Sequence, residues 1–109
     1  MKQPTYTFIA DLAGYIPETP PDSIVSRTIF DDAQARGVLF SFAAGQELSE
    51  HTASQPAILH FVQGEAEITL GGDGKQVQAG TWVHMPPKLP HSIQAQTPLT
   101  MLLLLLKSS

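Results

Sequence analysis

The chain has 109 residues, of which 42% are hydrophobic and 15% charged, a composition typical of one globular domain and too small for two hydrophobic cores. Its formal net charge of −4 comes from ten acids and six bases. The bases are scattered along the sequence, so we expect no nucleic-acid partner. The chain has no cysteine, which excludes disulfides and thiolate ligands and fits a cytoplasmic location.

The first 22 residues differ from the rest of the chain. Residues 11–16 favour neither helix nor strand, and residues 17–21, with three prolines, form a stiff linker. We therefore expect an N-terminal arm over residues 1–22, packed on the main domain or on a partner, and a folded domain over residues 23–109. The residues after Met1 alternate between polar and apolar types, so we expect no signal peptide.

Short strands account for the remaining sequence. No segment has a long apolar stripe of helical period, and β-branched and aromatic residues predict strands over residues 23–30, 38–43, 58–62, 65–70, 76–78, 81–85, 91–96 and 100–106. The polar segment 31–37 predicts a turn that joins the first two strands in a hairpin. Strands separated by turn signals at intervals of about 8–12 residues predict an all-β sandwich or barrel of two antiparallel sheets.

The last apolar run, Leu99–Leu106, is far shorter than the roughly 20 residues of a membrane-spanning helix. We therefore expect a buried strand and no membrane partner. Within it, Leu102–Leu106 has no polar face, which favours burial on both sides and predicts a homodimer.

Two groups of residues stand at the spacings of known motifs; they are Gly45, His51 and Gly64, followed by Gly80, Pro86 and His91. These spacings resemble the two sequence motifs of the cupin family. The segments Gly45–His51, Gly64–Ile68 and Pro90–Ser92 are similar to small single-domain cupins of the RmlC-like superfamily, of the cupin 2 conserved-barrel type. The resemblance implies a jelly-roll barrel, or double-stranded β-helix, over roughly residues 23–106. The three glycines stand at strand junctions, where we expect a positive φ or a close backbone approach.

Four positions depart from the family pattern. Ala53 and Ala57 stand where the first motif has a histidine and a glutamate, so two of the usual four metal ligands are missing. In the subgroup that the chain resembles, the first motif often carries a single histidine and has an alanine in place of the glutamate, so both departures fit that subgroup. Lys88 and Ala95 stand where the second motif has a glycine and an asparagine.

The resemblance points to His51 and His91 as ligands of a divalent transition metal, because neutral imidazole binds iron, nickel, copper and zinc. Two imidazoles alone make a weak site, and the alternative is that both are metal-free hydrogen-bonding groups in an apolar pocket. The residues that we expect to line this pocket are Ala53, Ala57, Phe61 and Met101.

The other two histidines are poor candidates for metal ligation. Side chains of a strand point alternately to its two faces, so if position 57 faces the barrel interior, His60 points away from it. By the same rule Trp82 and His84 face outward, while Val83 and Met85 face inward. We expect His60 and His84 to lie near each other on the outer face of one sheet. Two further candidates for acid–base chemistry, Glu47 and Glu50, fit a solvated polar turn better.

Three functions stay open from the sequence. The first is a barrel that binds a small molecule, with a weak divalent-metal site at His51 and His91. The second is a metal-dependent enzyme of the oxygenase or isomerase type acting on a small carbonyl compound or hydroxy acid, which the missing carboxylate at Ala57 weakens. The third is a metal-free dimeric binding or sensing module. No residue is singled out as catalytic, because no nucleophile elbow, phosphate loop or H-E-x-x-H pattern is present.

Overall fold

The structure is a computed structural model that describes residues 5–107; the ends of the predicted arm and domain, residues 1–4 and 108–109, lie outside it. Within the described range it contains nine strands and no helix that could cross a membrane. The strands are β1 (Ile24–Asp31), β2 (Ala35–Phe42), β3 (Glu47–His51), β4 (Ala57–Gln63), β5 (Glu65–Leu70), β6 (Asp73–Gln78), β7 (Trp82–Met85), β8 (His91–Ala95) and β9 (Leu99–Leu106).

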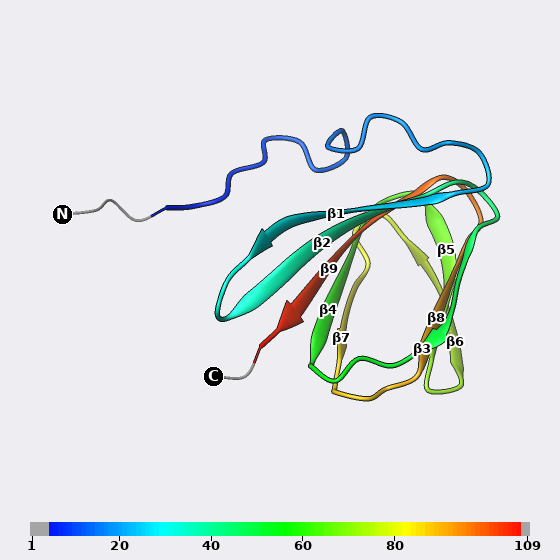
Figure 1. Cartoon of the computed structure of the whole chain (residues 1–109). Helices are drawn as coiled ribbons and strands as arrows, with labels where there is room; N and C mark the ends of the chain where they lie inside the picture. Colours follow the sequence, from blue (N-terminus) through cyan, green and yellow to red (C-terminus); the bar gives the residue numbers. More distant parts are fainter. Residues whose placement is uncertain (1–4, 108–109) are drawn as a thin grey trace.

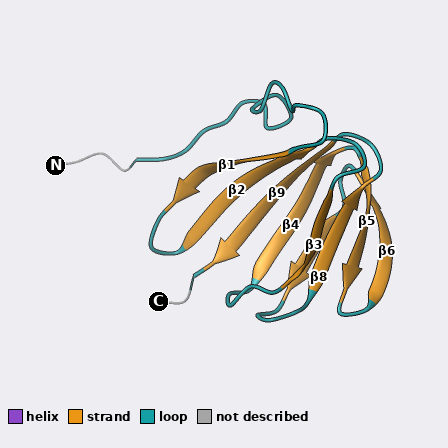
Figure 2. Cartoon of the chain, turned by 45° about the vertical axis from the view of Figure 1, so that its right-hand side comes forward, coloured by secondary structure: helices purple, strands orange, loops and turns teal. Residues whose placement is uncertain are grey.

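The strands form two antiparallel sheets that face each other as a jelly-roll barrel (Figures 1 and 2). The five-stranded sheet has the order β1-β2-β9-β4-β7, and the four-stranded sheet has the order β3-β8-β5-β6. Several neighbours are far apart in the sequence, such as β2 with β9 and β3 with β8, so the pairing ties the two halves of the chain together. The predicted all-β fold is confirmed.

Eight of the nine strands match segments predicted from the sequence, with ends moved by a few residues. The predicted turn over 31–37 is too long, because β2 already begins at Ala35. The Asp32 carboxylate accepts hydrogen bonds from the backbone N–H groups of Gln34 (2.8 Å) and Ala35 (3.0 Å), which closes a tighter turn. The first two strands form the expected hairpin.

The prediction of a polar turn around Glu47 and Glu50 is wrong, because Glu47–His51 is strand β3. This strand lies at the edge of the four-stranded sheet and pairs only with β8. Only Leu48 packs against the core, while its four neighbours in the strand are exposed. An edge strand with one inward apolar residue leaves no alternation for a sequence pattern to detect.

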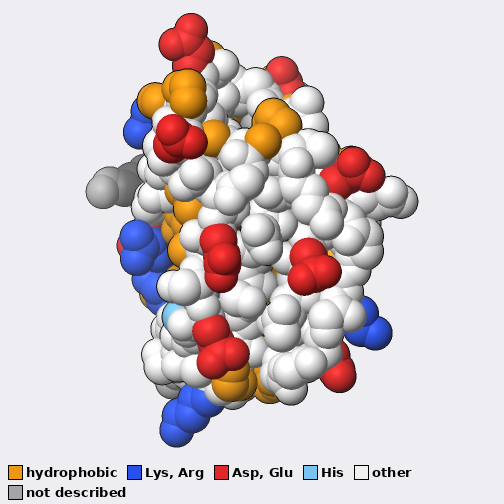
Figure 3. Space-filling view, turned by 90° about the vertical axis from the view of Figure 1, so that its right-hand side faces the viewer, with side chains coloured by type: hydrophobic (Ala, Val, Ile, Leu, Met, Phe, Trp, Pro, Cys, Tyr) orange, Lys and Arg blue, Asp and Glu red, His pale blue; other side chains and the backbone are white. Residues whose placement is uncertain are grey.

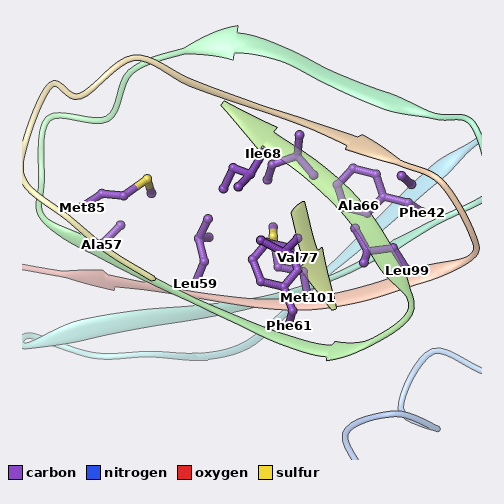
Figure 4. Packing of buried hydrophobic residues seen from close by; sticks show 12 residues of the cluster. Phe42, Ala57, Leu59, Phe61, Ala66, Ile68, Val77, Met85, Leu99 and Met101 are labelled. Atoms are coloured by element: carbon purple, nitrogen blue, oxygen red, sulfur yellow. The ribbon is translucent and has the colours of Figure 1, made fainter. Parts of the chain in front are cut away.

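Apolar side chains from both sheets fill the barrel interior (Figure 4). The five-stranded sheet contributes Leu59 and Phe61 from β4 and Met101 from β9, and the four-stranded sheet contributes Ile68 and Ile93. All five are at most 1% exposed, so they supply a continuous hydrophobic core between the sheets.

The outer face of the four-stranded sheet is polar. Glu47, Gln94, Glu67 and Gln76 lie directly opposite one another across its four strands. Figure 3 shows this side of the molecule with separated acidic side chains among uncharged polar groups. This face is therefore the solvated side of the sheet. It explains why exposed and buried side chains alternate at the start of β5.

Glycines allow the turns at three strand junctions. Gly45, Gly64 and Gly80 have φ angles of 84°, 95° and 94°, which confirms the predicted positive φ. Gly64 also lies against the chain before β9: a Cβ atom there would stand 2.1 Å from the carbonyl oxygen of Pro98.

From residue 5 to the start of β1 the described chain contains no strand, and it runs over the five-stranded sheet (Figures 1 and 2). Ile16 is 8% exposed, and the hydroxyl groups of Thr19 and Ser41 form a hydrogen bond that attaches the segment to β2. The outward side chains of Leu102, Leu104 and Leu106 on β9 are only half-buried in the single chain.

Candidate functional site

The candidate site is built from two neighbouring strands of the four-stranded sheet. His51 is the last residue of β3 and His91 the first of β8, and the register places them directly opposite each other. Their ring centroids are 4.2 Å apart, with 57° between the ring planes. The pairing thus brings together the two histidines that the cupin resemblance selects.

Backbone hydrogen bonds orient both rings in the same way. Nδ1 of His51 lies 2.8 Å from the carbonyl oxygen of Ser49, and Nδ1 of His91 lies 2.9 Å from that of Leu89. A carbonyl oxygen can only accept, so each Nδ1 carries the proton and donates it. Each Nε2 then keeps a free lone pair, the form in which imidazole binds a metal or accepts a hydrogen bond.

Burial favours the neutral form of His91. Its side chain is 6% exposed, and desolvation lowers its pKa below the usual value of 6.5. The hydrogen bond to Leu89 opposes this shift, while the nearby charge of a protonated His51 adds to it, and the net effect is a lowered pKa. His91 is therefore a neutral ligand or acceptor at neutral pH.

The two departures from the first motif lie at the same end of the barrel. Ala53 is half-buried in the loop between β3 and β4, and Ala57 is buried as the first residue of β4. Met85 on β7 and Leu105 on β9 flank Ala57 directly on its two sides (Figure 4 shows Met85 and Ala57 together). An apolar row therefore occupies the place where the family's first motif has a carboxylate.

The other two predicted pocket residues lie deeper in the barrel. Phe61 and Met101 are opposite each other on β4 and β9 and belong to the core. Phe61 is four residues beyond Ala57, roughly 13 Å along an extended strand. Met85 is the closer neighbour of Ala57, because the two residues are paired between β4 and β7. Alternation along the strand predicted only that Met85 faces inward, since a residue pattern does not reveal which strands pair.

Two loops meet at the histidine end of the barrel. The backbone N–H of Lys88, in the loop before β8, donates to the carbonyl oxygen of Ala53, 2.7 Å away. Lys88 stands where the family's second motif has a glycine, and its φ of 69° lies in the left-handed region that favours glycine. The same loop supplies the carbonyl of Leu89 that orients His91.

An apolar groove approaches the site from the seam between β6 and β7. Its volume is about 410 Å³, and its lining includes Ile68, Leu70, Val77, Trp82 and Val83. Leu70 lies directly opposite His91 in the four-stranded sheet. Leu70 therefore both lines the groove and neighbours His91 in the sheet.

The residues present fit part of a metal site. Within residues 5–107, no group of three or more histidine, cysteine, aspartate or glutamate side chains is placed to hold an ion. The Nε2 atoms of His51 and His91 would hold two positions of a metal, and other positions would fall to water or ligand oxygens.

The remaining histidines lie where the alternation rule puts them. His60 and His84 are exposed on the outer face of the five-stranded sheet, where His60 lies opposite Trp82 and His84 opposite Ile58. They take no part in the site, and they provide natural controls for it.

The comparisons with known proteins agree with this architecture. The model of the cupin domain family matches residues 38–106, more than half of the chain, and the chain therefore belongs to the cupin family. A search of curated proteins finds no match.

Solved structures extend the likeness over nearly the whole chain. A conserved protein of unknown function from Streptococcus pyogenes is 27% identical with a TM-score of 0.84, covering 99% of this chain and 94% of its own. A cupin superfamily protein from Desulfitobacterium hafniense is 23% identical with a TM-score of 0.82, covering 89% of each chain.

A more distant neighbour shares the fold alone. Salicylate 1,2-dioxygenase from Pseudoaminobacter salicylatoxidans is 16% identical with a TM-score of 0.73, covering 82% of this chain and 26% of its own.

Proposed function

We propose that this cupin binds a small molecule at the barrel end that carries His51 and His91, and that these histidines hold a divalent transition metal weakly. The observation that carries the proposal is the paired geometry: both Nδ1–H groups are used by backbone carbonyls, and the two rings lie 4.2 Å apart with free Nε2 atoms. Nitrogen ligands of this kind suit zinc, copper, nickel and iron.

The residues around the pair define what the site can do. His91 is held in its neutral form by burial, and its ring is fixed by the loop that Lys88 ties to Ala53. A bound ion would polarise a carbonyl or hydroxyl oxygen of the ligand. Ala57 supplies no negative charge, so a chelator should remove the ion more readily than from a site with a third protein ligand.

Metal titration tests this proposal. Protein stripped with a chelator and dialysed is titrated with Co²⁺ by calorimetry, and its bound metal is counted by elemental analysis after gel filtration. We expect His51→Ala and His91→Ala each to abolish binding, while the control variants His60→Ala and His84→Ala bind as the unaltered chain does. Metal binding that survives in the double variant of His51 and His91 would place the metal elsewhere and refute the assignment.

A metal-free binding module is the second candidate. It is favoured by the apolar row of Met85, Ala57 and Leu105 at the position of the missing carboxylate. In that case His51 and His91 act as hydrogen-bond acceptors toward a ligand, and the stripped protein binds no Co²⁺. Enzymatic activity of the oxygenase or isomerase type is the weaker proposal, since the likeness to a dioxygenase concerns the fold.

We also propose that the chain forms a homodimer through the outer face of the five-stranded sheet. The half-buried Leu102 and Leu104 on β9, Ile58 on β4 and the 60% exposed Trp82 on β7 form its apolar part. Gel filtration with light scattering at micromolar concentration tests it, and a monomer would refute it.

A further inference from the structure

Strands β6 and β7 each form the outer edge of a sheet, so each has one side without a partner strand. They follow each other in the chain and are joined by a turn in which the N–H of Thr81 donates to the carbonyl oxygen of Gln78, 3.0 Å away. Beyond this turn they belong to different sheets, and Figure 1 shows them apart. The groove of about 410 Å³ described above lies along this seam, with its lining supplied by β5, β6 and β7, and we call it the seam groove.

The floor of the seam groove is apolar. Ile68 of β5 and Val77 of β6 are 0% and 2% exposed and belong to the core (Figure 4). Leu70 of β5 and Val83 of β7 pack against this core but are only half-buried. A ligand lying on these two side chains would remove apolar surface from water, which favours binding without any polar contact.

Lys75 of β6 brings a positive charge to this apolar groove. It lies directly opposite Ile68 in the sheet, so its side chain leaves the backbone on the inner face. No aspartate or glutamate is among the lining residues, and Asp73, on the same face of β6, is not one of them. In the described part of the chain the one ion pair joins Lys107 to Asp31, so the Lys75 ammonium has no carboxylate partner there.

An inward lysine at the edge of a sheet has two uses. It prevents the free edge from pairing with another strand, which requires only a charge at the edge. It also binds an anion, and for an organic anion this use requires an apolar surface beside the charge. The seam groove provides that surface next to Lys75, so the surroundings favour the second use.

We infer that the seam groove binds a small carboxylic acid with an apolar body. The ammonium of Lys75 donates charge-assisted hydrogen bonds to the carboxylate, and the apolar body lies on Leu70 and Val83. Ligand pockets of proteins range from about 300 to 1,000 Å³, so the volume of the groove suits a compact ligand, such as one with a single ring. This site is distinct from the histidine pair proposed above and needs no metal.

Methyl NMR on the full chain tests the site. The chain is labelled at its isoleucine and valine methyl groups, stripped with a chelator so that no metal contributes, and titrated with 3-phenylpropionate. The same titration is made with the neutral 3-phenylpropionamide and with the cation 3-phenylpropylamine. We expect the methyl signals of Ile68, Val77 and Val83 to shift. Because Lys75 forms a charged hydrogen bond only with the acid, the acid should bind about tenfold more tightly than the amide, and the amine more weakly than either.

Three variants examine the role of the charge. Lys75→Met keeps an apolar side chain of similar length, and because Lys75 is exposed, the change removes no core contact. Lys75→Arg keeps the charge. The matched control is Lys88→Met, at an exposed lysine that does not line the groove. We expect Lys75→Met to bind acid and amide with equal affinity, while Lys75→Arg and Lys88→Met keep the preference for the acid.

Each of three results would overturn the inference. If the unaltered chain binds acid and amide equally, Lys75 does not select a carboxylate. If the shifts gather at other methyl groups, the ligand lies outside the seam groove. If no compound shifts a signal up to its solubility limit, the groove is not a binding site and Lys75 only protects the sheet edge. Co²⁺ binding by His51 and His91 is measured separately, so the failure of one proposal is distinguished from the failure of the other.

Discussion

Lys88→Gly should stabilise the protein, because Lys88 occupies a conformation that suits glycine. Its φ of 69° lies in the left-handed region, which costs a residue with a Cβ about 1–2 kcal/mol. Glycine removes that strain but adds about 0.5–1 kcal/mol of backbone entropy to the unfolded chain. The Lys88 side chain is exposed, so its loss removes little packing, and the backbone bond to Ala53 persists. The expected net gain is about 0.5–1 kcal/mol.

The assay is thermal and urea unfolding followed by circular dichroism. For a chain of this size, such a gain raises the melting temperature by about 2–5 °C. Lys88→Ala is the matched control, since it removes the same charge and side chain but keeps the Cβ atom and hence the strain. We expect Lys88→Ala to melt at or slightly below the temperature of the unaltered chain.

The comparison of Lys88→Gly with Lys88→Ala shows whether the backbone at position 88 is strained. If Lys88→Gly and Lys88→Ala unfold at the same temperature, the left-handed conformation stores no strain, and the reasoning fails. Co²⁺ binding should be unchanged in both, since His51, His91 and the carbonyl of Leu89 are untouched.

Two predictions concern pH. Backbone N–H groups of Gln34 and Ala35 lower the pKa of Asp32 below 3.8, so its carboxylate stabilises the fold above that pH and loses this effect as the pH falls through the lower folded value. Asp32→Ala should therefore reduce the melting temperature at pH 7 but not at pH 2.5; a constant difference would contradict this. Burial lowers the pKa of His91 below 6.5, so the unfolded chain takes up the proton first and stability falls as the pH drops below about 6.5. His91→Gln should flatten the dependence of urea stability on pH between 8 and 5, and His60→Gln should not; equal slopes in all three proteins would exclude this role for His91.

The sequence predicted the barrel because its turns and its strand faces are local properties. Gly45 and Gly80 mark junctions through a backbone freedom that a single residue carries, and alternation placed His60 outward and Met85 inward without knowledge of the partners. The edge strand Glu47–His51 was missed because one inward residue, Leu48, makes no pattern.

The residues of the candidate site could be predicted from the sequence, but not their arrangement in space. The motif spacings selected His51 and His91, but their direct opposition is a property of register between β3 and β8, which are 40 residues apart in the chain. The same holds for Met85 beside Ala57, since the sequence fixes the face of a residue and the fold fixes its neighbours. The backbone acceptors of Ser49 and Leu89, which decide which nitrogen is free, carry no side-chain signal at all.

Gly64 and Gly80 allow a last test, because the two motif glycines have nearly the same φ but different surroundings. Their φ angles are 95° and 94°, so Gly64→Ala and Gly80→Ala both introduce strain of about 1–2 kcal/mol. A Cβ atom at Gly80 meets nothing within 4 Å, whereas one at Gly64 would stand 2.1 Å from the carbonyl oxygen of Pro98 and 2.9 Å from Cα of Leu99.

Those contacts are backbone atoms, so Gly64→Ala must displace the chain between β8 and β9. Displacement weakens the bonds that Glu65 makes there, including its N–H to the hydroxyl of Thr97 at 2.9 Å. Overpacking adds about 1–3 kcal/mol to the strain. We therefore expect Gly64→Ala to melt well below Gly80→Ala, by several degrees or more. Equal melting temperatures would show that the chain near Pro98 moves aside at little cost in free energy and would contradict this reasoning. A lower melting temperature for Gly64→Ala would show that glycine is needed for the turn conformation at Gly80 and also for close backbone packing at Gly64.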